Sequence, residues 1–400
     1  MDLVHLQEVK KERQEMTPRK LVTLSLAGLV ATAGTLAVIS TAMMASAAAA
    51  PQGVLSGLPW VHGAYLDHNP GNIALFQTDT GKQLDAVEGF AALDDISNIS
   101  WQAPGAAPVT SVGGKLILSV PLWASNKTVN TGSTAAFGTL RNNLVAAGIA
   151  NKTIVRLGWE MNIDFGHWSV TSSNRANWVL RFQQAVTALR ANNSGIQVAF
   201  NPNEGASQSG RLANIWQLAL DLKPYFEWVG IDFYNWDGSM NTATGWASRY
   251  GEAYGMKQWE DWARANGKGF SVPEWGGTQQ NTASDDTYYT QQMIKRFAAM
   301  GGGETVNSIQ YPGIPVFESV FSEPGFDYTP TWGGTLARYR LMNDSPTGTP
   351  RPAQLPVMAA AYKAALASVV VQPTPSASSG SPDPTTSPTV SPTPTVSPTC

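Results

Sequence analysis

The sequence has 400 residues, of which 43% are hydrophobic and 14% are charged, so the chain is long enough to bury a large core and is not a disordered or fibrous protein. Its 26 Lys and Arg and 29 Asp and Glu give a formal net charge of −3, and the central part has no basic run. We therefore expect no binding of nucleic acid. One cysteine and four histidines provide few thiolate or imidazole ligands, and we expect no metal site.

Residues 1–50 have the composition of an export signal. Basic residues occur up to Lys20, an uncharged apolar run follows over 21–44, and small residues then surround the Ala-Ser-Ala at 45–47. We expect cleavage before Pro51 and a secreted protein. Because the apolar run is long enough to span a bilayer, an uncleaved anchor at the cell surface is the alternative, and only then is a membrane contacted.

Residues 372–400 are rich in Pro, Thr and Ser, a composition that is typical of an extended linker without a core. Cys400 follows this segment as the last residue. It is either a lone terminal residue or the first residue of a further disulfide-containing module, which an exported protein would tolerate. Between the two terminal segments we expect one folded domain, residues 51–371, acting as a monomer.

Short apolar runs of strand length alternate with longer stretches of helical periodicity. The predicted strands are 61–65, 85–90, 115–122, 153–159, 196–200, 228–233 and 269–272, with an eighth within 306–321. The predicted helices are 133–147, 174–191, 210–222, 254–265 and 286–300. About eight βα units in this length predict an α/β fold, the (β/α)8 TIM barrel. An open doubly wound sheet is the alternative, but no G-x-G-x-x-G or P-loop pattern follows a predicted strand.

Two glutamates follow predicted strands at positions where barrels place their functional side chains. Glu160 follows the fourth strand and Glu274 the seventh, so both are expected at the mouth formed by the carboxyl ends of the strands. Two carboxylates across one mouth are what glycoside hydrolysis requires, because one must protonate the departing oxygen and the other must attack the anomeric carbon. A glutamate at a strand end can also form a structural ion pair, and this interpretation stays open from spacing alone.

Other polar and aromatic residues are expected around this pair. Arg156 lies four residues before Glu160, on the same face of a strand, where it is suited to hold a carboxylate network. The hydroxyl of Tyr234, after the sixth strand, is suited to donate to a neighbouring carboxylate. Tryptophans near the strand ends are candidate sugar-stacking platforms; they are Trp123, Trp159, Trp168, Trp236, Trp275 and Trp332. The remaining candidates for substrate contact are Asn162, Asn201 and His62.

Three stretches resemble glycoside hydrolase family 26, in the clan whose acid/base and nucleophile follow strands 4 and 7. They are IVRLGWEMNIDFGHW (154–168), WVGIDFYNW (228–236) and SVPEWG (271–276), and the similarity extends over 58–366. The resemblance implies that Glu160 is the general acid/base, that Glu274 is the nucleophile and that Tyr234 hydrogen-bonds the nucleophile. It also implies a supporting role for Arg156 and a contact of Trp168 with substrate.

The resemblance implies a retaining endo-β-glycosidase that needs no cofactor, with β-1,4-mannan as the expected substrate. One position departs from the family, whose mannanases usually carry His immediately before the acid/base, where this chain has Trp159. A β-glucan or a microbial exopolysaccharide is therefore an alternative substrate. A non-catalytic carbohydrate-binding wall protein, in which the glutamates are structural, is the alternative of a different class.

Overall fold

The structure is a computed structural model that describes residues 52–128, 130–131, 134–163, 166–205, 214–277, 285–306, 308–322 and 355–369. The predicted export signal (1–50), the predicted linker (372–400) and Trp332 lie outside these residues.

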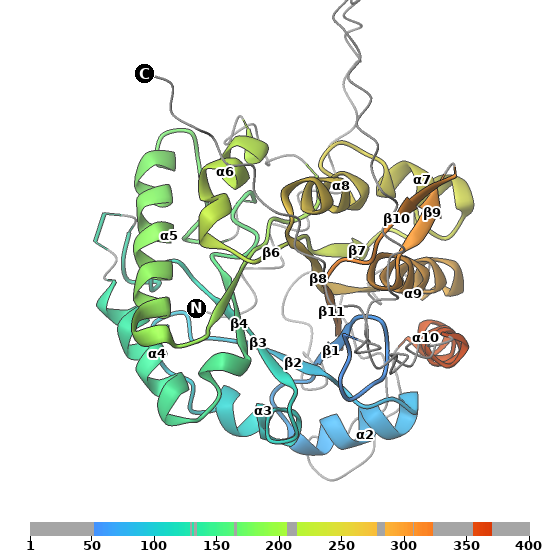
Figure 1. Cartoon of the computed structure of the whole chain (residues 1–400), viewed down its shortest axis with the longest axis horizontal. Coiled ribbons are helices and arrows are strands. Elements are labelled where there is room, and N and C mark those ends of the chain that lie inside the picture. Colours follow the sequence, from blue (N-terminus) through green and yellow to red (C-terminus); the bar gives the residue numbers. More distant parts are fainter. Residues whose placement is uncertain are drawn as a thin grey trace, which may run out of the picture.

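Parallel strands close into a barrel, which confirms the predicted (β/α)8 fold (Figure 1). Within the described residues its eight staves are β1 (Val61–Tyr65), β2 (Ala86–Phe90), β3 (Lys115–Val120), β4 (Thr153–Leu157), β5 (Gln197–Phe200), β6 (Trp228–Gly230), β8 (Gly269–Gly277) and β11 (Val316–Phe321). The barrel is closed because β11 pairs with both β1 and β8. A short strand, β7 (Phe233–Asn235), continues the path of β6 and pairs with the end of β8.

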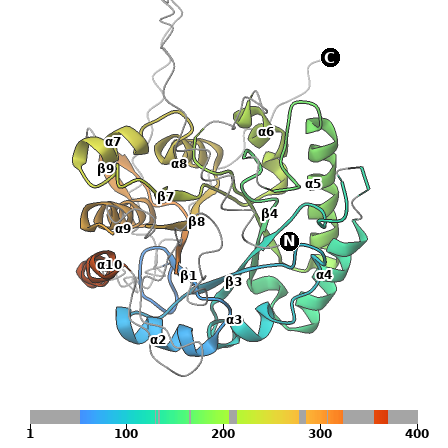
Figure 2. The same cartoon turned by 180° about the vertical axis from the view of Figure 1, so that it is seen from behind.

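Helices surround the barrel, as Figure 1 and the reverse view in Figure 2 show. They are α2 (Pro70–Thr80), α3 (Gln102–Thr110), α4 (Ala135–Ala146), α5 (Arg175–Arg190), α6 (Ile215–Leu222), α7 (Ala243–Tyr250), α8 (Met256–Asn266), α9 (Thr287–Gly302) and α10 (Pro356–Ser368). Short 3-10 turns are η2 (Ala150–Lys152), η3 (Ala191–Asn193) and η5 (Lys223–Tyr225). No helix in the described part of the chain is long and apolar enough to cross a membrane.

Four of these helices, α2, α3, α7 and α10, have no counterpart among the predicted elements. Helix α3 shows why, since it contains glycine and has Pro108 in its interior, both of which are poor helix formers. Ala106 and Val109 of α3 are buried, so packing against the barrel stabilises a segment that local propensity disfavours.

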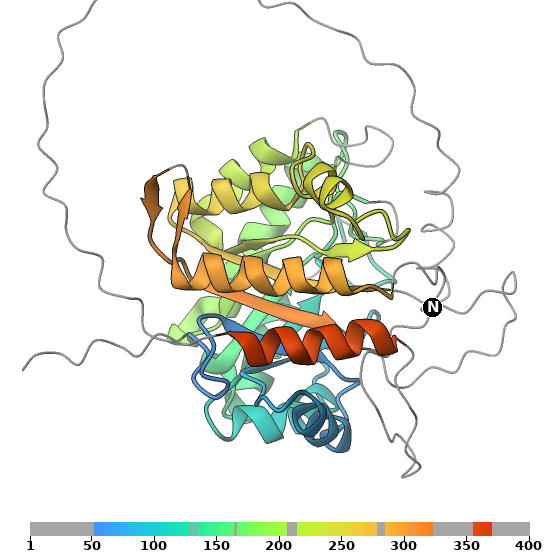
Figure 3. The same ribbon diagram turned by 90° about the vertical axis from the view of Figure 1, so that its right-hand side faces the viewer.

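The segment between α9 and β11 also differs from the prediction. The eighth strand was expected within 306–321 and occupies only the end of that range, Val316–Phe321. An antiparallel hairpin of β9 (Glu304–Val306) and β10 (Ile309–Tyr311) precedes it. Figure 3 shows this hairpin at the amino-terminal end of β11, with α9 and α10 side by side along the barrel.

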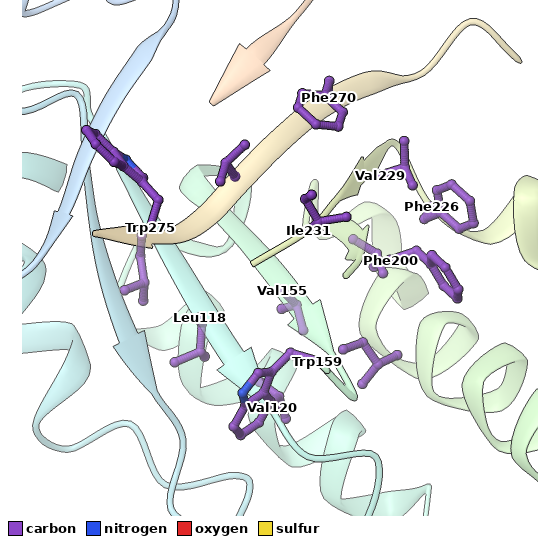
Figure 4. Packing of buried hydrophobic residues seen from close by; sticks show 14 of the residues in the cluster. Leu118, Val120, Val155, Trp159, Phe200, Phe226, Val229, Ile231, Phe270 and Trp275 are labelled. Carbon is purple, nitrogen blue, oxygen red and sulfur yellow. The ribbon is translucent and has the colours of Figure 1, made fainter. Parts of the chain in front are cut away.

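Side chains alternate between the two faces of each barrel strand. Leu118, Val120 and Val155 point outward into the apolar cluster beneath the helices, which Figure 4 shows. The inward-facing layer at the floor of the barrel is apolar and consists of Val61, Ala86, Ile117, Ile154, Ala199, Trp228 and Phe317.

Two residues further along their strands, the inward positions become polar. This second layer includes Glu88 on β2, Ser119 on β3, Arg156 on β4 and Ser319 on β11. The apolar floor therefore carries a buried polar layer directly beneath the mouth of the barrel.

Candidate active site

Arg156 is the centre of the polar layer and is fully buried. Its Nη2 donates to both carboxylate oxygens of Asp232, each at 2.8 Å. Its Nη1 donates to Glu88, to Ser119 Oγ at 2.8 Å and to Glu274 Oε1 at 3.0 Å. A guanidinium that is always charged and has a fixed fork of donors is suited to hold three carboxyl groups in one geometry.

Glu274 reaches this layer because β8 contains an irregularity of the β-bulge kind. In the pairing of β8 with β11, Glu318 lies opposite Val272 but Val320 lies opposite Trp275, so β8 has one extra residue over this interval. Strict alternation would place Glu274 on the outer face with Val272. The extra residue instead turns Glu274 inward, toward Arg156, as bulges near active sites commonly do.

Tyr234 fixes the second oxygen of Glu274. The Tyr234 hydroxyl donates to Glu274 Oε2 at 2.9 Å, and both side chains are buried. This is the contact expected from the sequence. With Arg156 on Oε1 and Tyr234 on Oε2, the carboxylate is held at both ends and cannot rotate without losing a charge-assisted hydrogen bond.

Glu160 lies in a tight turn after β4. Its backbone φ is 50°, a left-handed conformation that is uncommon for a residue other than glycine. Its backbone N–H donates to the carbonyl of Asn201 at 2.7 Å, and its Oε1 accepts a hydrogen bond from Asn203 Nδ2. Two residues that follow β5 therefore hold Glu160, Asn201 through its backbone and Asn203 through its side chain, and the residue is only 3% exposed.

Burial and neighbouring charges shift the pKa values of the charged groups in this region. Burial raises the pKa of Glu88 to about 8, which the positive charge of Arg156 only partly opposes. Burial also raises the pKa of Asp232 well above its usual value, and the negative charges of Glu274 and Glu160 raise it further. The carboxylates keep Arg156 charged, since their attraction outweighs the effect of burial on its pKa. Both glutamates of the predicted pair thus act on the same buried network.

Three of the residues predicted to contact substrate, Trp275, His62 and Trp168, are buried among other side chains. Trp275 is fully buried outside the barrel and donates to Glu318 Oε2 at 2.7 Å. His62 is also fully buried, and its Nδ1 lies 2.6 Å from Glu318 Oε1. Both residues occupy outward positions on their strands. Trp168 is buried as well, and its indole N–H donates to the carbonyl of Trp159 at 2.8 Å.

The two predicted asparagines, Asn162 and Asn201, are buried and form hydrogen bonds with other buried polar residues of the site. Asn162 Oδ1 accepts from the backbone N–H of Asn203 at 2.8 Å, and its Nδ2 donates to the carbonyl of Asn203 at 3.0 Å. Asn201 is fully buried and its Nδ2 donates to Asp232 Oδ1 at 3.0 Å. Both asparagines thus contact residues that hold Glu160 or Arg156, and their contact with substrate stays a prediction.

The remaining predicted aromatics lie nearer to the mouth. Trp159 is buried, with its ring 4.3 Å from that of Trp168 and 5.6 Å from that of Phe90. Trp123 is buried as well, and its indole N–H has no hydrogen-bond partner among the described residues. Trp236 is half-buried, with its ring 4.6 Å from that of Tyr234. Trp236 is therefore beside the residue that binds Glu274, and its contact with substrate stays a prediction.

One exposed tryptophan was missed by the sequence analysis. Trp101 precedes α3, in the connection that leaves the carboxyl end of β2, and it is 77% exposed. Within the described part of the chain it is the most exposed of the large hydrophobic residues apart from Val54. An exposed indole in a loop that follows a barrel strand is suited to stack on the face of a sugar ring.

Glu88, Asn203 and Asp232 complete the site. Asn203 and Asp232 lie at the ends of the fifth and sixth predicted strands, where polar residues are expected, whereas Glu88 was missed by the sequence analysis. Glu88 is a charged residue at an inward position of a strand, which is a signal that could have been read from AVEGF at 86–90. Asn203 and Asp232 follow their strands as Glu160 does, but nothing in their spacing indicates which carboxyl they contact. Among the described residues no group of His, Cys, Asp and Glu has the arrangement of a metal site.

No known sequence family and no curated protein matches this sequence. Similar solved structures include the GH26C protein of Muricauda sp. MAR_2010_75, with 14% identity, coverage of 67% of this chain and 82% of that chain, and a TM-score of 0.48. A GH26 β-mannanase of Bacteroides ovatus has 9% identity, coverage of 65% and 80%, and a TM-score of 0.45. An endo-β-1,4-glucanase of Xanthomonas axonopodis pv. citri has 10% identity, coverage of 77% and 99%, and a TM-score of 0.45.

The similarity is distant, and the function of this chain is inferred from its own side chains.

Proposed function

We propose that the chain is a retaining glycoside hydrolase that cleaves a polysaccharide by double displacement. The observation that carries this proposal is the arrangement around Glu274, whose two oxygens are held by Arg156 at 3.0 Å and by Tyr234 at 2.9 Å. A cation on one oxygen and a hydroxyl donor on the other fix the direction of the carboxylate, as a nucleophile requires.

In this mechanism Glu274 attacks the anomeric carbon while Glu160 gives its proton to the departing glycosidic oxygen. The resulting glycosyl ester on Glu274 is then hydrolysed by a water molecule, which Glu160 deprotonates as a base. The proton that Glu160 loses departs with the first leaving group and is replaced by a proton from the water, whose oxygen bonds to the anomeric carbon as the bond to Glu274 breaks. The chain's own groups supply both steps, so the mechanism calls for no metal ion or organic cofactor.

β-1,4-Mannan is the substrate that we propose first, on the resemblance of the motifs to family 26. Trp159 favours a second candidate, a β-glucan or an exopolysaccharide. The position before Glu160 is occupied by a buried indole packed against Trp168 and Phe90. An indole at this position cannot provide the contacts that an exposed imidazole would make with the sugar next to the cleavage point.

We further propose that the protein acts outside the cell. The proposal is supported by the export-signal composition of residues 1–50 and by the Pro, Thr and Ser composition of residues 372–400. A polysaccharide is too large to enter a cell intact, so an extracellular location suits the proposed substrate.

The test is the release of reducing sugar by the protein from mannan, glucomannan, mixed-linkage glucan, β-1,3-glucan, xylan and cellulose. Glu274→Ala and Glu160→Gln should each lower the rate by orders of magnitude. Proton NMR of the first product should show retention of the anomeric configuration. If the parent binds polysaccharide but never cleaves it, the chain is a carbohydrate-binding protein and the proposed function is overturned.

A further inference from the structure

The backbone at Glu160 is held in an unfavourable conformation. Its φ of 50° is in the left-handed region, which costs a residue with a side chain on the order of 1 kcal/mol and persists only where the surroundings impose it. The hydrogen bond of 2.7 Å from its N–H to the carbonyl of Asn201 is one such constraint. The position of Glu160 is therefore set from the end of β5 and not by β4 alone.

Asn203 adds a contact to the reactive group itself. Its Nδ2 donates to Oε1 of Glu160, and the two residues are 4% and 3% exposed. A neutral amide donor that is bound to one carboxyl oxygen leaves the proton to be carried by Oε2. It also stabilises the carboxylate that remains after the proton has been given away.

Asn203 is in turn held by Asn162. The single side chain of Asn162 accepts from the backbone N–H of Asn203 at 2.8 Å and donates to its carbonyl at 3.0 Å. Both backbone groups of Asn203 are occupied, so its peptide cannot rotate without losing two buried hydrogen bonds. Because Asn162 lies only two residues after Glu160, the turn that carries the acid also holds the residue that aims it.

We propose that Asn203 is the positioning residue of the acid/base, that it orients Glu160 so that Oε2 faces the departing oxygen, and that Asn162 holds Asn203 in place. The inference rests on the proposed function. Its consequence is confined to proton transfer: Asn203 assists the departure of a poor leaving group and has little effect on a leaving group that needs no proton.

The test compares two glycosides of one oligosaccharide, taken from whichever polysaccharide the protein cleaves, with 2,4-dinitrophenol or methanol as the leaving group. For Asn203→Ala we expect kcat/KM for the methyl glycoside to fall roughly 10–100-fold, a part of what general acid catalysis contributes. The dinitrophenyl glycoside should change by less than about threefold in the same variant, because its leaving group departs without protonation. Asn162→Ala should show the same pattern with a smaller fall.

A second readout is the pH profile for the methyl glycoside. Since the Asn203 amide stabilises the ionised form of Glu160, its removal should move the alkaline limb of kcat/KM to higher pH. The matched control is Asn143→Ala, which removes an asparagine hydrogen bond of 2.8 Å to the carbonyl of Ser97, away from the site. It should change neither glycoside, and thermal unfolding should show that all three variants are folded.

Equal losses on both glycosides in Asn203→Ala, or no loss on either, would overturn the positioning role while leaving the proposed function intact. If the parent cleaves no glycoside of any leaving group, the proposed function and this inference fail together.

Discussion

Arg156 Nη1 and Glu274 Oε1 lie 3.0 Å apart in the interior of the barrel, although their residues are 118 positions apart in the sequence. The same nitrogen also serves Glu88 and Ser119, and the other terminal nitrogen binds both oxygens of Asp232. One buried cation therefore links β2, β3, β4, the segment between β6 and β7, and β8. The residue that orients the proposed nucleophile is also a structural tie of the barrel.

Arg156→Lys should accordingly be costly for folding. A lysine has one ammonium and cannot reproduce the two bonds to Asp232 together with the bond to Glu274. We expect a loss of roughly 3–5 kcal/mol in the free energy of unfolding, as for other broken buried ion pairs. Urea denaturation measures it. Arg175→Lys, which alters a partly exposed pair with Asp221, should cost less than about 1 kcal/mol; equal costs would refute the central role of Arg156.

Tyr234→Phe should damage catalysis more than folding. The substitution removes the hydroxyl that donates to Glu274 Oε2 at 2.9 Å, and a hydrogen bond to a charged group is worth about 1.5–3 kcal/mol. We expect kcat/KM to fall roughly 10–100-fold, measured on the polysaccharide that the protein cleaves.

Tyr289→Phe is the matched control for this change. The Tyr289 hydroxyl is also buried and donates to the carbonyl of Phe233 at 2.6 Å, but it does not contact Glu274 in the described structure. This variant should lose stability and keep its kcat/KM. A similar kinetic loss in both variants would show that Tyr234 acts only through packing.

Glu88 gives the protein a characteristic dependence of stability on pH. Its pKa of about 8 in the folded state lies above its ordinary value of 4.5, so between these values the folded protein keeps a proton that the unfolded chain releases. The free energy of unfolding should fall in this window, by up to about 1.4 kcal/mol per pH unit from this group, and level off above it.

Glu88→Gln tests this dependence because it removes the titrating proton and retains an acceptor for Arg156. Urea denaturation of both proteins at pH 5 to 9 should show that the variant gains stability relative to the parent as the pH rises, with no further gain above about pH 8. Parallel curves for the two proteins would mean that Glu88 is ionised throughout this range.

Trp101→Ala should weaken binding of long substrates. The side chain is 77% exposed, follows β2 on the side of the mouth and contributes little to the core, so its removal should leave the unfolding temperature nearly unchanged. Loss of stacking against a sugar should raise KM for polysaccharide several-fold, with kcat retained. An unchanged KM on the polymer would exclude Trp101 from the binding surface.

The fold could be predicted from the sequence because strands of a buried parallel sheet consist of short apolar runs, such as KLILSV in β3. Helix α3 could not be predicted, since its stability depends on packing and not on its residues' propensities. The hairpin of β9 and β10 was missed because its strands have three residues each, too few for a periodic signal.

The site was predictable where one strand position determines the direction of a side chain. Arg156 follows this rule, and the bond of Tyr234 to Glu274 was foreseen as well. Trp275 was misplaced because it was expected at the mouth with its neighbour Glu274, although adjacent strand residues face opposite sides. The link from Asn162 through Asn203 to Glu160 joins two turns, and only the three-dimensional arrangement reveals it.

The bulge in β8 determines the face of the strand from which the side chain of the proposed nucleophile, Glu274, projects. Pro273 lies within the extra-residue interval between Val272 and Trp275, and a proline in a central strand is tolerated at such a bulge. If the bulge were lost while Pro273 was kept, strict alternation would put Glu274 on the same face as Val272, toward the helices, while every catalytic residue type remained in the sequence. In related chains, the presence of this bulge is therefore as informative about activity as the presence of the glutamate itself.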